Sequence, residues 1–403
     1  MNFMKNKEVR NAIMIGGLCS VSYLAVYFAR NILGAVTPRM IEGGFTTEYI
    51  GSVSSLYFIF YAIGQLINGA VGDKIKARYM ISLGLIFAGA STVVFRSFSH
   101  LPQISRIAYA MTGFFLSMIY GPMTKVVAEN TAPIYATRCS LGYEFASLIG
   151  SPVAGLAASF MAWQSVFTLS SGVLFVMGGL CFVVFMTLEK KGIVQYNRYD
   201  RPKSGQTGGI SVLIKHRIVK FTLISVITGI IRTTVVFWLP TYISDYLGFS
   251  SEKSALIFTV STLVISLTTF IAIFIYERLG YNMDKTILLM FSVSALCFMG
   301  VYTAKHPWVN IVFMVMAIMA SGGAATMLWS RYCPSLRDTG MVSGATGFLD
   351  FVSYMAAAAS STIFANAVSV IGWGRLILVW FTIMVTGVIV ALPWKIHKPK
   401  TAQ

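Results

Sequence analysis

The sequence predicts an all-α membrane protein with twelve transmembrane helices in two pseudo-symmetric six-helix halves. Composition, the number of uncharged apolar runs and an internal repeat support this fold class. Of the 403 residues, 56% are apolar and only 11% are charged, and the mean hydropathy is +0.73. A soluble domain has about 25% charged residues, and its exterior must be wet. The composition therefore excludes an ordinary cytosolic enzyme, a disordered chain and a secreted disulfide scaffold.

Apolar runs of membrane-spanning length occur along the whole chain. A bilayer core of about 30 Å requires about 20 apolar residues per helix. The uncharged run 145–188 is too long for one helix, so we expect a turn at 161–164 that divides it into two. The expected spans are residues 11–36, 49–72, 79–95, 107–124, 145–188 as two helices, 221–238, 254–276, 286–304, 307–330, 339–368 and 376–394.

The basic residues predict the orientation. Twelve alternating spans place both termini on one side of the membrane. If that side is the cytoplasm, the cytoplasmic segments hold 23 Lys and Arg and the outer segments hold six. Because cytoplasmic loops carry an excess of Lys and Arg, we expect a bacterial inner-membrane protein with both termini in the cytoplasm. The same bias explains the net charge of +17, so we expect no nucleic-acid partner.

One polar segment, residues 189–217, is longer than the others and divides the chain. It contains Arg-Pro-Lys-Ser-Gly-Gln-Thr-Gly-Gly at 201–209, a composition typical of a flexible linker. We therefore expect an N-terminal six-helix bundle at 1–188, a cytoplasmic linker at 189–217 and a C-terminal six-helix bundle at 218–403.

The two halves repeat a pattern of an arginine followed by a proline. Arg30 lies eight residues before Pro38, and Arg232 lies eight before Pro240. The two arginines are 202 residues apart, which is half the chain. Transporters built from two parallel repeats bind their substrate near the bilayer midplane, between the repeats. We therefore expect the two arginines to face each other across a central cavity.

Glu144 directly precedes the uncharged run 145–188 and belongs to the fifth expected helix, and Asp350 lies in the eleventh. These two charges occupy corresponding helices of the two halves. A charge at the bilayer centre costs about 2.5–3.5 kcal/mol even on the lower scale. Two converging guanidinium groups suit a dianion such as a phosphate monoester, which offers oxygens for bidentate contacts from both sides. The alternative is a pair of structural ion pairs between the arginines and the acids, or an acid that holds an arginine until substrate replaces it.

Tyr23 and Tyr27 precede Arg30 at spacings that place all three residues on one helix face. Phenol groups that face a cavity can hydrogen-bond an anion or a sugar hydroxyl, although tyrosines also pack or lie in the interfacial belt. We expect these two tyrosines to line the cavity.

Asp73, Lys74 and Arg78 lie at the inner end of the second span. An acid and a basic cluster at a helix-to-helix turn can pair with neighbouring helix ends and stabilise one conformation. We interpret the three residues as a conformational latch, with a simple cytoplasmic basic loop as the alternative.

Several absences narrow the function. The five cysteines are odd in number and have no CxxC spacing, and the four histidines lie in loops or tails. We therefore expect no metal site and no cofactor. The linker glycines lack the Lys-Ser/Thr ending of a nucleotide-binding loop. We expect no enzymatic activity and transport that is driven by gradients.

Four segments carry a resemblance to a known family: Tyr27-Phe-Ala-Arg30-Asn31, Tyr61-Ala-Ile-Gly-Gln65, Trp238-Leu-Pro240 and Gly344-Ala-Thr-Gly347. Together they resemble the organophosphate:phosphate antiporters of the major facilitator superfamily, which include the glycerol-3-phosphate and hexose-phosphate transporters. The resemblance covers nearly all the chain. It implies the major facilitator fold and rocker-switch exchange of an organic phosphate for inorganic phosphate.

The resemblance also implies roles for single residues. The family's paired phosphate-binding arginines correspond to Arg30 and Arg232. Its cavity tyrosines correspond to Tyr23, Tyr27, Tyr61 and Tyr354. The family's lysine in the second span corresponds to Gln65, so one positive charge is missing from the site. The family's histidine in the fifth span falls near Glu144 or Phe145.

These departures leave alternatives open. The substrate is a small anion, and the coupling species is inorganic phosphate or a proton. A proton-coupled symporter of a carboxylate or sugar acid, with Glu144 as the proton carrier, is one alternative, because a buried Glu can have its pKa raised toward neutrality. A transporter-like sensor of sugar phosphate is another. The central arginines disfavour an efflux pump for cations. We expect a monomer whose only other partner is the lipid bilayer.

Overall fold

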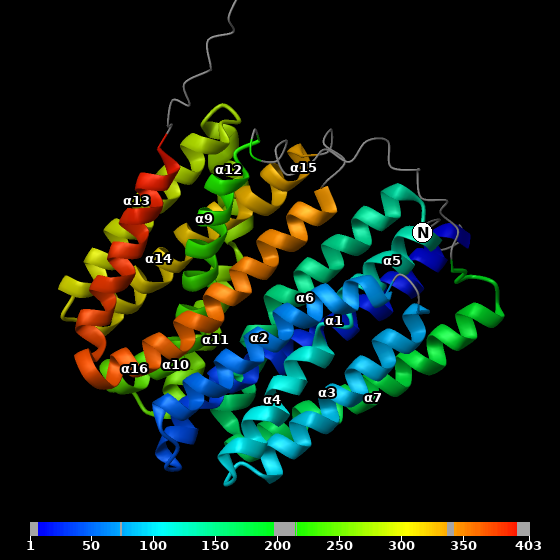
Figure 1. Cartoon of the computed structure of the whole chain (residues 1–403), viewed down its shortest axis with the longest axis horizontal. Helices are drawn as coiled ribbons and strands as arrows, with labels where there is room; N and C mark the ends of the chain where they lie inside the picture. Colours follow the sequence, from blue (N-terminus) through cyan, green and yellow to red (C-terminus); the bar gives the residue numbers. More distant parts are fainter. Residues whose placement is uncertain (1–6, 73–74, 197–213, 215, 337–341, 393–403) are drawn as a thin grey trace, which may run out of the picture.

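The structure is a computed structural model, and in the part of the chain that it describes it is all-helical (Figure 1). The described residues are 7–72, 75–196, 214, 216–336 and 342–392. Within them, nine helical segments are long and apolar enough to cross a membrane. The all-α membrane fold is thereby confirmed.

The first six passes comprise seven helices. They are α1 (Lys7–Glu42), α2 (Thr47–Gly72), α3 (Ala77–Ser97), α4 (Pro102–Leu116), α5 (Tyr120–Asn130), α6 (Pro133–Phe160) and α7 (Trp163–Lys190). The turn between α6 and α7 falls at 161–162, inside the expected range. The fourth pass is divided, because Pro122 has no N–H to donate to the carbonyl of Met118 and the helix breaks after Leu116.

The other six passes contain α-helices and short π-helical segments. They are α9 (Ile218–Gly229), η2 (Ile230–Val235), α10 (Val236–Thr241), η3 (Tyr242–Tyr246), α11 (Ser251–Ser266), α12 (Thr268–Arg278), α13 (Met283–Thr303), α14 (Pro307–Met327), η4 (Leu328–Tyr332), α15 (Cys333–Ser335) and α16 (Val342–Ala391). The long α16 bends at Gly372, where φ is 73° and ψ is 168°, a conformation that favours glycine. Its two arms are the eleventh and twelfth passes.

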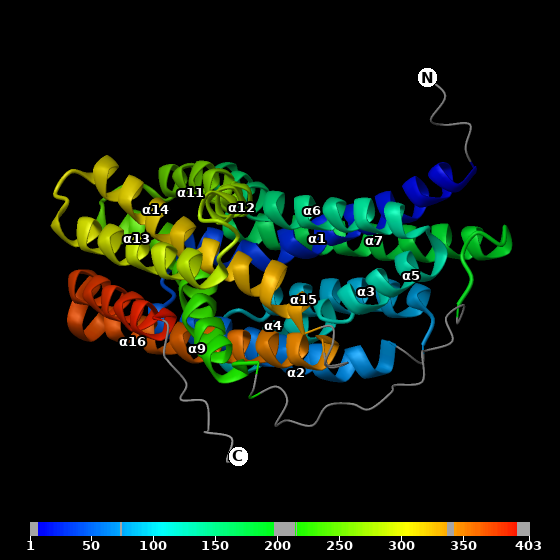
Figure 2. The same ribbon diagram turned by 90° about the horizontal axis from the view of Figure 1, so that it is seen from above.

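The same helix pairs pack in both halves. In the first half the main pairs are α1 with α6, α3 with α7, and α2 with α4. In the second half the corresponding pairs are α9 with α16, α13 with α16, and α12 with α14, and α13 also packs extensively on α14 as α3 does on α4. These are the same pairs after a shift of six passes, and Figure 2 shows the halves as two groups side by side. The pairing agrees with the pseudo-symmetry that the arginine repeat predicts.

Glycines allow α1 and α6 to approach closely. A Cβ at Gly150 would lie 2.8 Å from the backbone carbon of Tyr27, and a Cβ at Gly16 or Gly142 would collide with side chains of the opposite helix. Because lipid is as apolar as a leucine side chain, helices in a membrane associate through such small-residue packing. The packing fixes the position of α1, which carries Arg30.

The halves meet along three seams, where α2 contacts α16, α6 contacts α11, and α1 contacts α10. The first two seams exchange places under the six-pass shift, and α2 and α16 run side by side in Figures 1 and 2. Each seam has a glycine whose Cβ would come closer than 3.0 Å to the other half: Gly34 to Phe237, Gly51 to Ala365, and Gly155 to Thr259.

We call the side where α1 begins and α16 ends the terminal side, which is at the top of Figure 1, and the opposite side the far side. All three seam glycines lie in the part of their helix that is nearer the far side. The halves are therefore joined most closely at the far side.

Gly150→Leu is expected to destabilise the protein. The added side chain would meet the backbone of α1, and overpacking a close interface typically costs about 1–3 kcal/mol. Thermal unfolding of the purified protein in detergent should show a lower midpoint. The matched control is Gly179→Leu on α7, where nothing lies within 4 Å of an added Cβ. Equal midpoints for the two variants would contradict the α1–α6 packing.

Candidate functional site

Arg30 lies in an aromatic cage at the junction of three helices. Its Nη1 donates a hydrogen bond of 2.8 Å to the hydroxyl of Tyr354 on α16. Its guanidinium carbon lies 5.3, 5.0 and 4.8 Å from the ring centroids of Tyr27, Tyr61 and Tyr354. Cation–π contacts of this length are attractive, more so away from water. The half-buried guanidinium is thus held in one place by both halves of the molecule.

The expected tyrosines extend the cage on both sides. Tyr23 is 8% exposed, and its ring lies 5.0 Å from that of Tyr27. Tyr61 packs edge-on against Tyr354 at 5.0 Å. The structure therefore brings together all four tyrosines that the sequence placed in the site.

Tyr57 is a further residue of the candidate site, and the sequence analysis missed it. Its ring stacks on Tyr61 at 6.1 Å, it is 2% exposed, and it interacts electrostatically with Arg30. Its buried hydroxyl has no hydrogen-bond partner among the described residues, and a buried polar group of this kind requires an explanation. The spacing of four residues to Tyr61 was the available signal.

Arg232 and Asp350 complete the centre of the site. Arg232 lies in η2, and π-helical turns are frequent at functional sites. Unlike the half-buried Arg30, Arg232 is exposed. Asp350 is half-buried on α16, one turn before Tyr354, and interacts electrostatically with both arginines. Within the described residues, neither arginine forms an ion pair with Asp350 inside 4 Å. The acid is close to both but is bound to neither.

The other expected residues are less informative. Gln65 lies one turn after Tyr61 on α2 and is half-buried. The side chain of Glu144 on α6 lies outside the described residues, as do Asp73 and Lys74 of the expected latch. The roles of these residues remain predictions.

Arg78, the third residue of the expected latch, pairs within the first half. Its Nη1 donates to a carboxylate oxygen of Glu189 at 2.9 Å, and the hydroxyl of Tyr196 donates to the other oxygen at 2.8 Å. The ion pair joins the start of α3 to the end of α7. It does not connect the two halves.

A connection between the halves lies instead at the far side, on Arg39. Its Nη2 pairs with Glu252 of α11 at 3.2 Å, and the guanidinium also donates to two carbonyls at the end of α6, at 2.8 and 3.0 Å. Nearby, Ser251 donates a hydrogen bond to Glu42. These contacts tie α1 and α6 to α11, and they reinforce the glycine seams.

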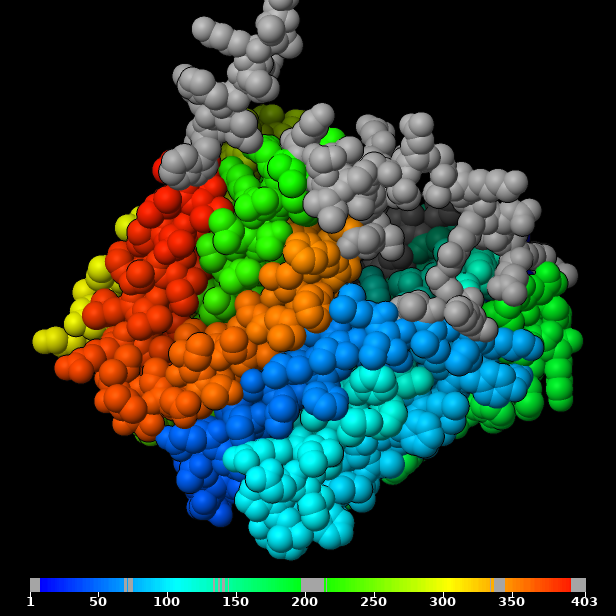
Figure 3. Space-filling view, viewed as in Figure 1, coloured from blue at the N-terminus to red at the C-terminus, as the bar shows by residue number. Residues whose placement is uncertain are grey.

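The terminal side of the molecule is less closed than the far side. Figure 3 shows a surface recess on the terminal side, between the orange helix α16 and the teal helices of the first half. A pocket of about 290 Å³ lies between α1 and α6 on the same side, with Gly16, Ser20, Arg138 and Gly142 among its lining residues. The arginine site thus lies between a joined far side and a recessed terminal side.

Comparisons with known proteins come from sequences and from solved structures. The glycerol-3-phosphate transporter of Bacillus subtilis is 24% identical over 270 residues, which are 62% of this chain and 60% of that protein. The phosphoglycerate transporter protein of Salmonella typhimurium is 22% identical over 386 residues, or 88% and 82% of the two chains. The membrane sensor protein UhpC of the same organism is 30% identical over 96 residues, or 24% and 22%. The chain therefore matches less than two thirds of the first and third of these relatives.

Solved structures agree on the fold. The crystal structure of a D-xylose–proton symporter has a TM-score of 0.71 at 14% identity and covers 94% of this chain and 96% of that one. The xylose transporter XylE from Escherichia coli, in a partially occluded inward-open conformation, also has a TM-score of 0.71, with 96% and 100% covered. The sequence profile of the Major Facilitator Superfamily matches residues 19–361. This protein therefore belongs to the Major Facilitator Superfamily.

Proposed function

We propose that this protein is a secondary active transporter of a small organic anion, preferably a phosphate ester such as a sugar phosphate or glycerol phosphate. The observation that carries the proposal is the gathering of Arg30, Arg232 and a ring of phenol groups at the boundary between the two halves. Relatives named as glycerol-3-phosphate and phosphoglycerate transporters support the same substrate class. Membership of a transporter family supports transport rather than enzymatic chemistry.

The cage holds the Arg30 guanidinium in one orientation before a phosphate group binds. A guanidinium that is already fixed loses little side-chain entropy when it binds a planar pair of oxygens. Because the Tyr354 oxygen accepts from Arg30, its own proton is available to a ligand. Tyr57 can donate in the same way. Charge-assisted contacts from Arg30 on one side and Arg232 on the other would then enclose the phosphate.

Alternating access follows from the arrangement of the halves. The excess of Lys and Arg on the terminal side supports a cytoplasmic location for that side in a bacterial inner membrane. On this assignment, the described conformation is closed outside and recessed toward the cytoplasm. A bound anion reduces the repulsion between the two arginines, so it favours conformations that bring the halves together around the site. Parting of the far-side seams would then release the substrate outside.

A proton-coupled symporter of a monoanion, such as a sugar acid, is the second candidate. Asp350 favours it, because one acid beside two arginines leaves a single net positive charge in the centre of the site. Gln65 adds no charge there, whereas Glu144 is a second possible proton carrier. Exchange for inorganic phosphate remains the first candidate because two arginines and several phenols suit a dianion better than a carboxylate.

Uptake into proteoliposomes separates these functions. Vesicles preloaded with inorganic phosphate should take up glycerol 3-phosphate or hexose 6-phosphate without a pH gradient, and empty vesicles should not. Uptake into empty vesicles that requires a pH gradient would support the symporter instead. Substrate binding with no uptake under either condition would contradict transport and support a sensor.

Arg30→Lys and Arg232→Lys should each lower transport at least about tenfold, the equivalent of 1.4 kcal/mol. Lysine keeps the charge but loses the planar bidentate contact. The measurement is initial uptake rate with the amount of inserted protein held equal. Arg375→Lys, at an exposed far-side position, is the matched control. Wild-type uptake rates in both site variants would show that the two arginines do not bind the substrate.

Asp350→Asn should tighten the binding of phosphate esters, because it removes the acid that competes for both arginines. An apparent affinity several-fold higher is expected, with exchange retained. Substrate titration of the purified protein measures the affinity, and counterflow measures exchange. Loss of pH-driven uptake with counterflow retained would instead identify Asp350 as the proton carrier of the symporter.

Arg39→Gln should open the far side more often. The variant loses both the ion pair to Glu252 and the hydrogen bonds to the end of α6. Glu252→Gln loses only the ion pair, which contributes about 0–1 kcal/mol because Glu252 is 56% exposed. The probe is a thiol introduced at the buried α2–α16 seam by Ser361→Cys, labelled with a membrane-impermeant reagent. Labelling should rise strongly for Arg39→Gln and weakly for Glu252→Gln. The control Arg106→Gln should leave it unchanged, and unchanged labelling in Arg39→Gln would refute the far-side closure.

A further inference from the structure

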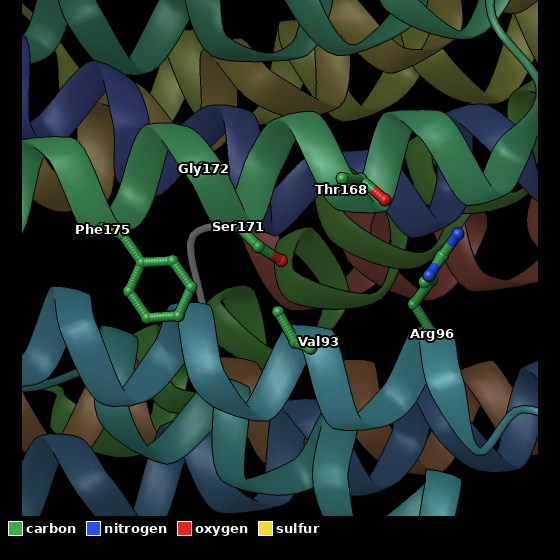
Figure 4. A pocket seen from close by; sticks show the side chains of 6 residues that line it. All are labelled: Val93, Arg96, Thr168, Ser171, Gly172 and Phe175. Atoms are coloured by element: carbon green, nitrogen blue, oxygen red, sulfur yellow. The ribbon is translucent and has the colours of Figure 1, made fainter.

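A second pocket lies away from the arginine site, between α3 and α7. Its volume is about 250 Å³, and its lining residues are Val93, Arg96, Thr168, Ser171, Gly172 and Phe175. Figure 4 shows Phe175 at one end, Arg96 at the other, and Val93 opposite Ser171 between them. The main contacts between the two halves are made by other helices. The pocket therefore opens on the outer face of the first half, where a membrane protein meets lipid.

The pocket offers hydrocarbon rather than polar contacts. Val93 and Phe175 are 40% and 39% exposed, so they leave apolar surface open to the membrane. The two hydroxyl groups already donate to carbonyls of their own helix, Thr168 to Gln164 at 2.9 Å and Ser171 to Phe167 at 2.8 Å. Gly172 has nothing within 4 Å of an added Cβ, so it forms an open part of the wall. A polar solute would lose its hydration here without replacement.

Arg96 supplies a cation at one end of this apolar slot. It lies in the last turn of α3, at the far-side end of the helix, and its side chain is exposed. Among the described residues it forms no ion pair. Two other far-side arginines are engaged, since Arg39 pairs with Glu252 and Arg106 donates to Ser52 at 2.9 Å. A guanidinium at the depth of the headgroups is well suited to a phosphate.

We propose that this pocket binds one anionic phospholipid of the far-side leaflet. One acyl chain lies in the slot between α3 and α7, against Val93, Gly172 and Phe175. The headgroup phosphate lies on Arg96. The combination distinguishes this occupant from a partner helix, because an apolar slot that ends at a single cation matches the chain and charge of one lipid molecule. The proposal does not depend on the transported substrate.

Native mass spectrometry of the purified protein, titrated with phosphatidylglycerol in detergent micelles, tests the proposal. Wild-type protein should retain one lipid beyond the non-specific background. Gly172→Leu fills the slot and Arg96→Gln removes the phosphate contact, so each should lower the affinity at least about fivefold. The matched controls are Gly179→Leu, an equally open position two turns along α7, and Arg375→Gln, another exposed far-side arginine. Both should bind as wild type does.

Three outcomes would overturn the proposal. The first is equal retention by wild type, Gly172→Leu and Arg96→Gln. The second is an equal loss in the controls, which would show that any change on this surface disturbs binding. The third is a dimer in wild type that Gly172→Leu dissociates, which would show that a second copy covers the pocket. Thermal unfolding midpoints of all variants should match wild type, because none of the altered positions is packed.

Discussion

The contact between Arg30 and Tyr354 is the interaction on which the centre of the molecule depends. An uncompensated guanidinium near the bilayer midplane is costly, so α1 is stable there only if other helices provide π faces and an acceptor oxygen. Tyr61 of α2 and Tyr354 of α16 provide them at 5.0 and 4.8 Å. Because α1 and α2 belong to one half and α16 to the other, satisfying this single charge also joins the halves. The cage is therefore both the proposed binding site and a structural contact between the halves.

The pseudo-symmetry stops at the arginines themselves. Arg30 lies on a regular α-helix and is half-buried among three rings, whereas Arg232 lies on the π-helical segment η2 and is exposed. A cation held in one place defines where an anion binds, whereas an exposed cation can move together with the anion. We infer that an arriving anion meets Arg232 first and then settles on Arg30, where Tyr354 and Tyr57 add hydroxyl groups. On this inference, Arg30 and Arg232 occupy equivalent positions in the sequence repeat but have different roles in binding.

Sequence periodicity predicted those parts of the site that lie along a single helix. Spacings of three and four residues placed Tyr23 and Tyr27 with Arg30, and the twelve spans followed from the lengths of the apolar runs. The break in the fourth pass was missed, because apolar residues continue through it. The contacts of Arg39 were not predicted, since its partners, Glu252 and the end of α6, are more than 100 residues away in sequence. Contacts between helices leave no periodic signal, and family resemblance, rather than spacing, identified Tyr354.

The far-side seams suit a contact that must form and part repeatedly. Inside a bilayer the hydrophobic effect does not drive helices together, so the seams are stabilised by close packing at Gly34, Gly51 and Gly155. Dispersion contacts of this kind are individually weak and are lost as soon as the helices move slightly apart. The Arg39–Glu252 ion pair adds little, because Glu252 is largely exposed and water can replace it. A far side that is closed by many weak contacts can therefore be opened by a modest free energy, such as the proposed substrate binding would provide. The cage around Arg30 differs, because its contacts must be replaced by those of a ligand before it can part.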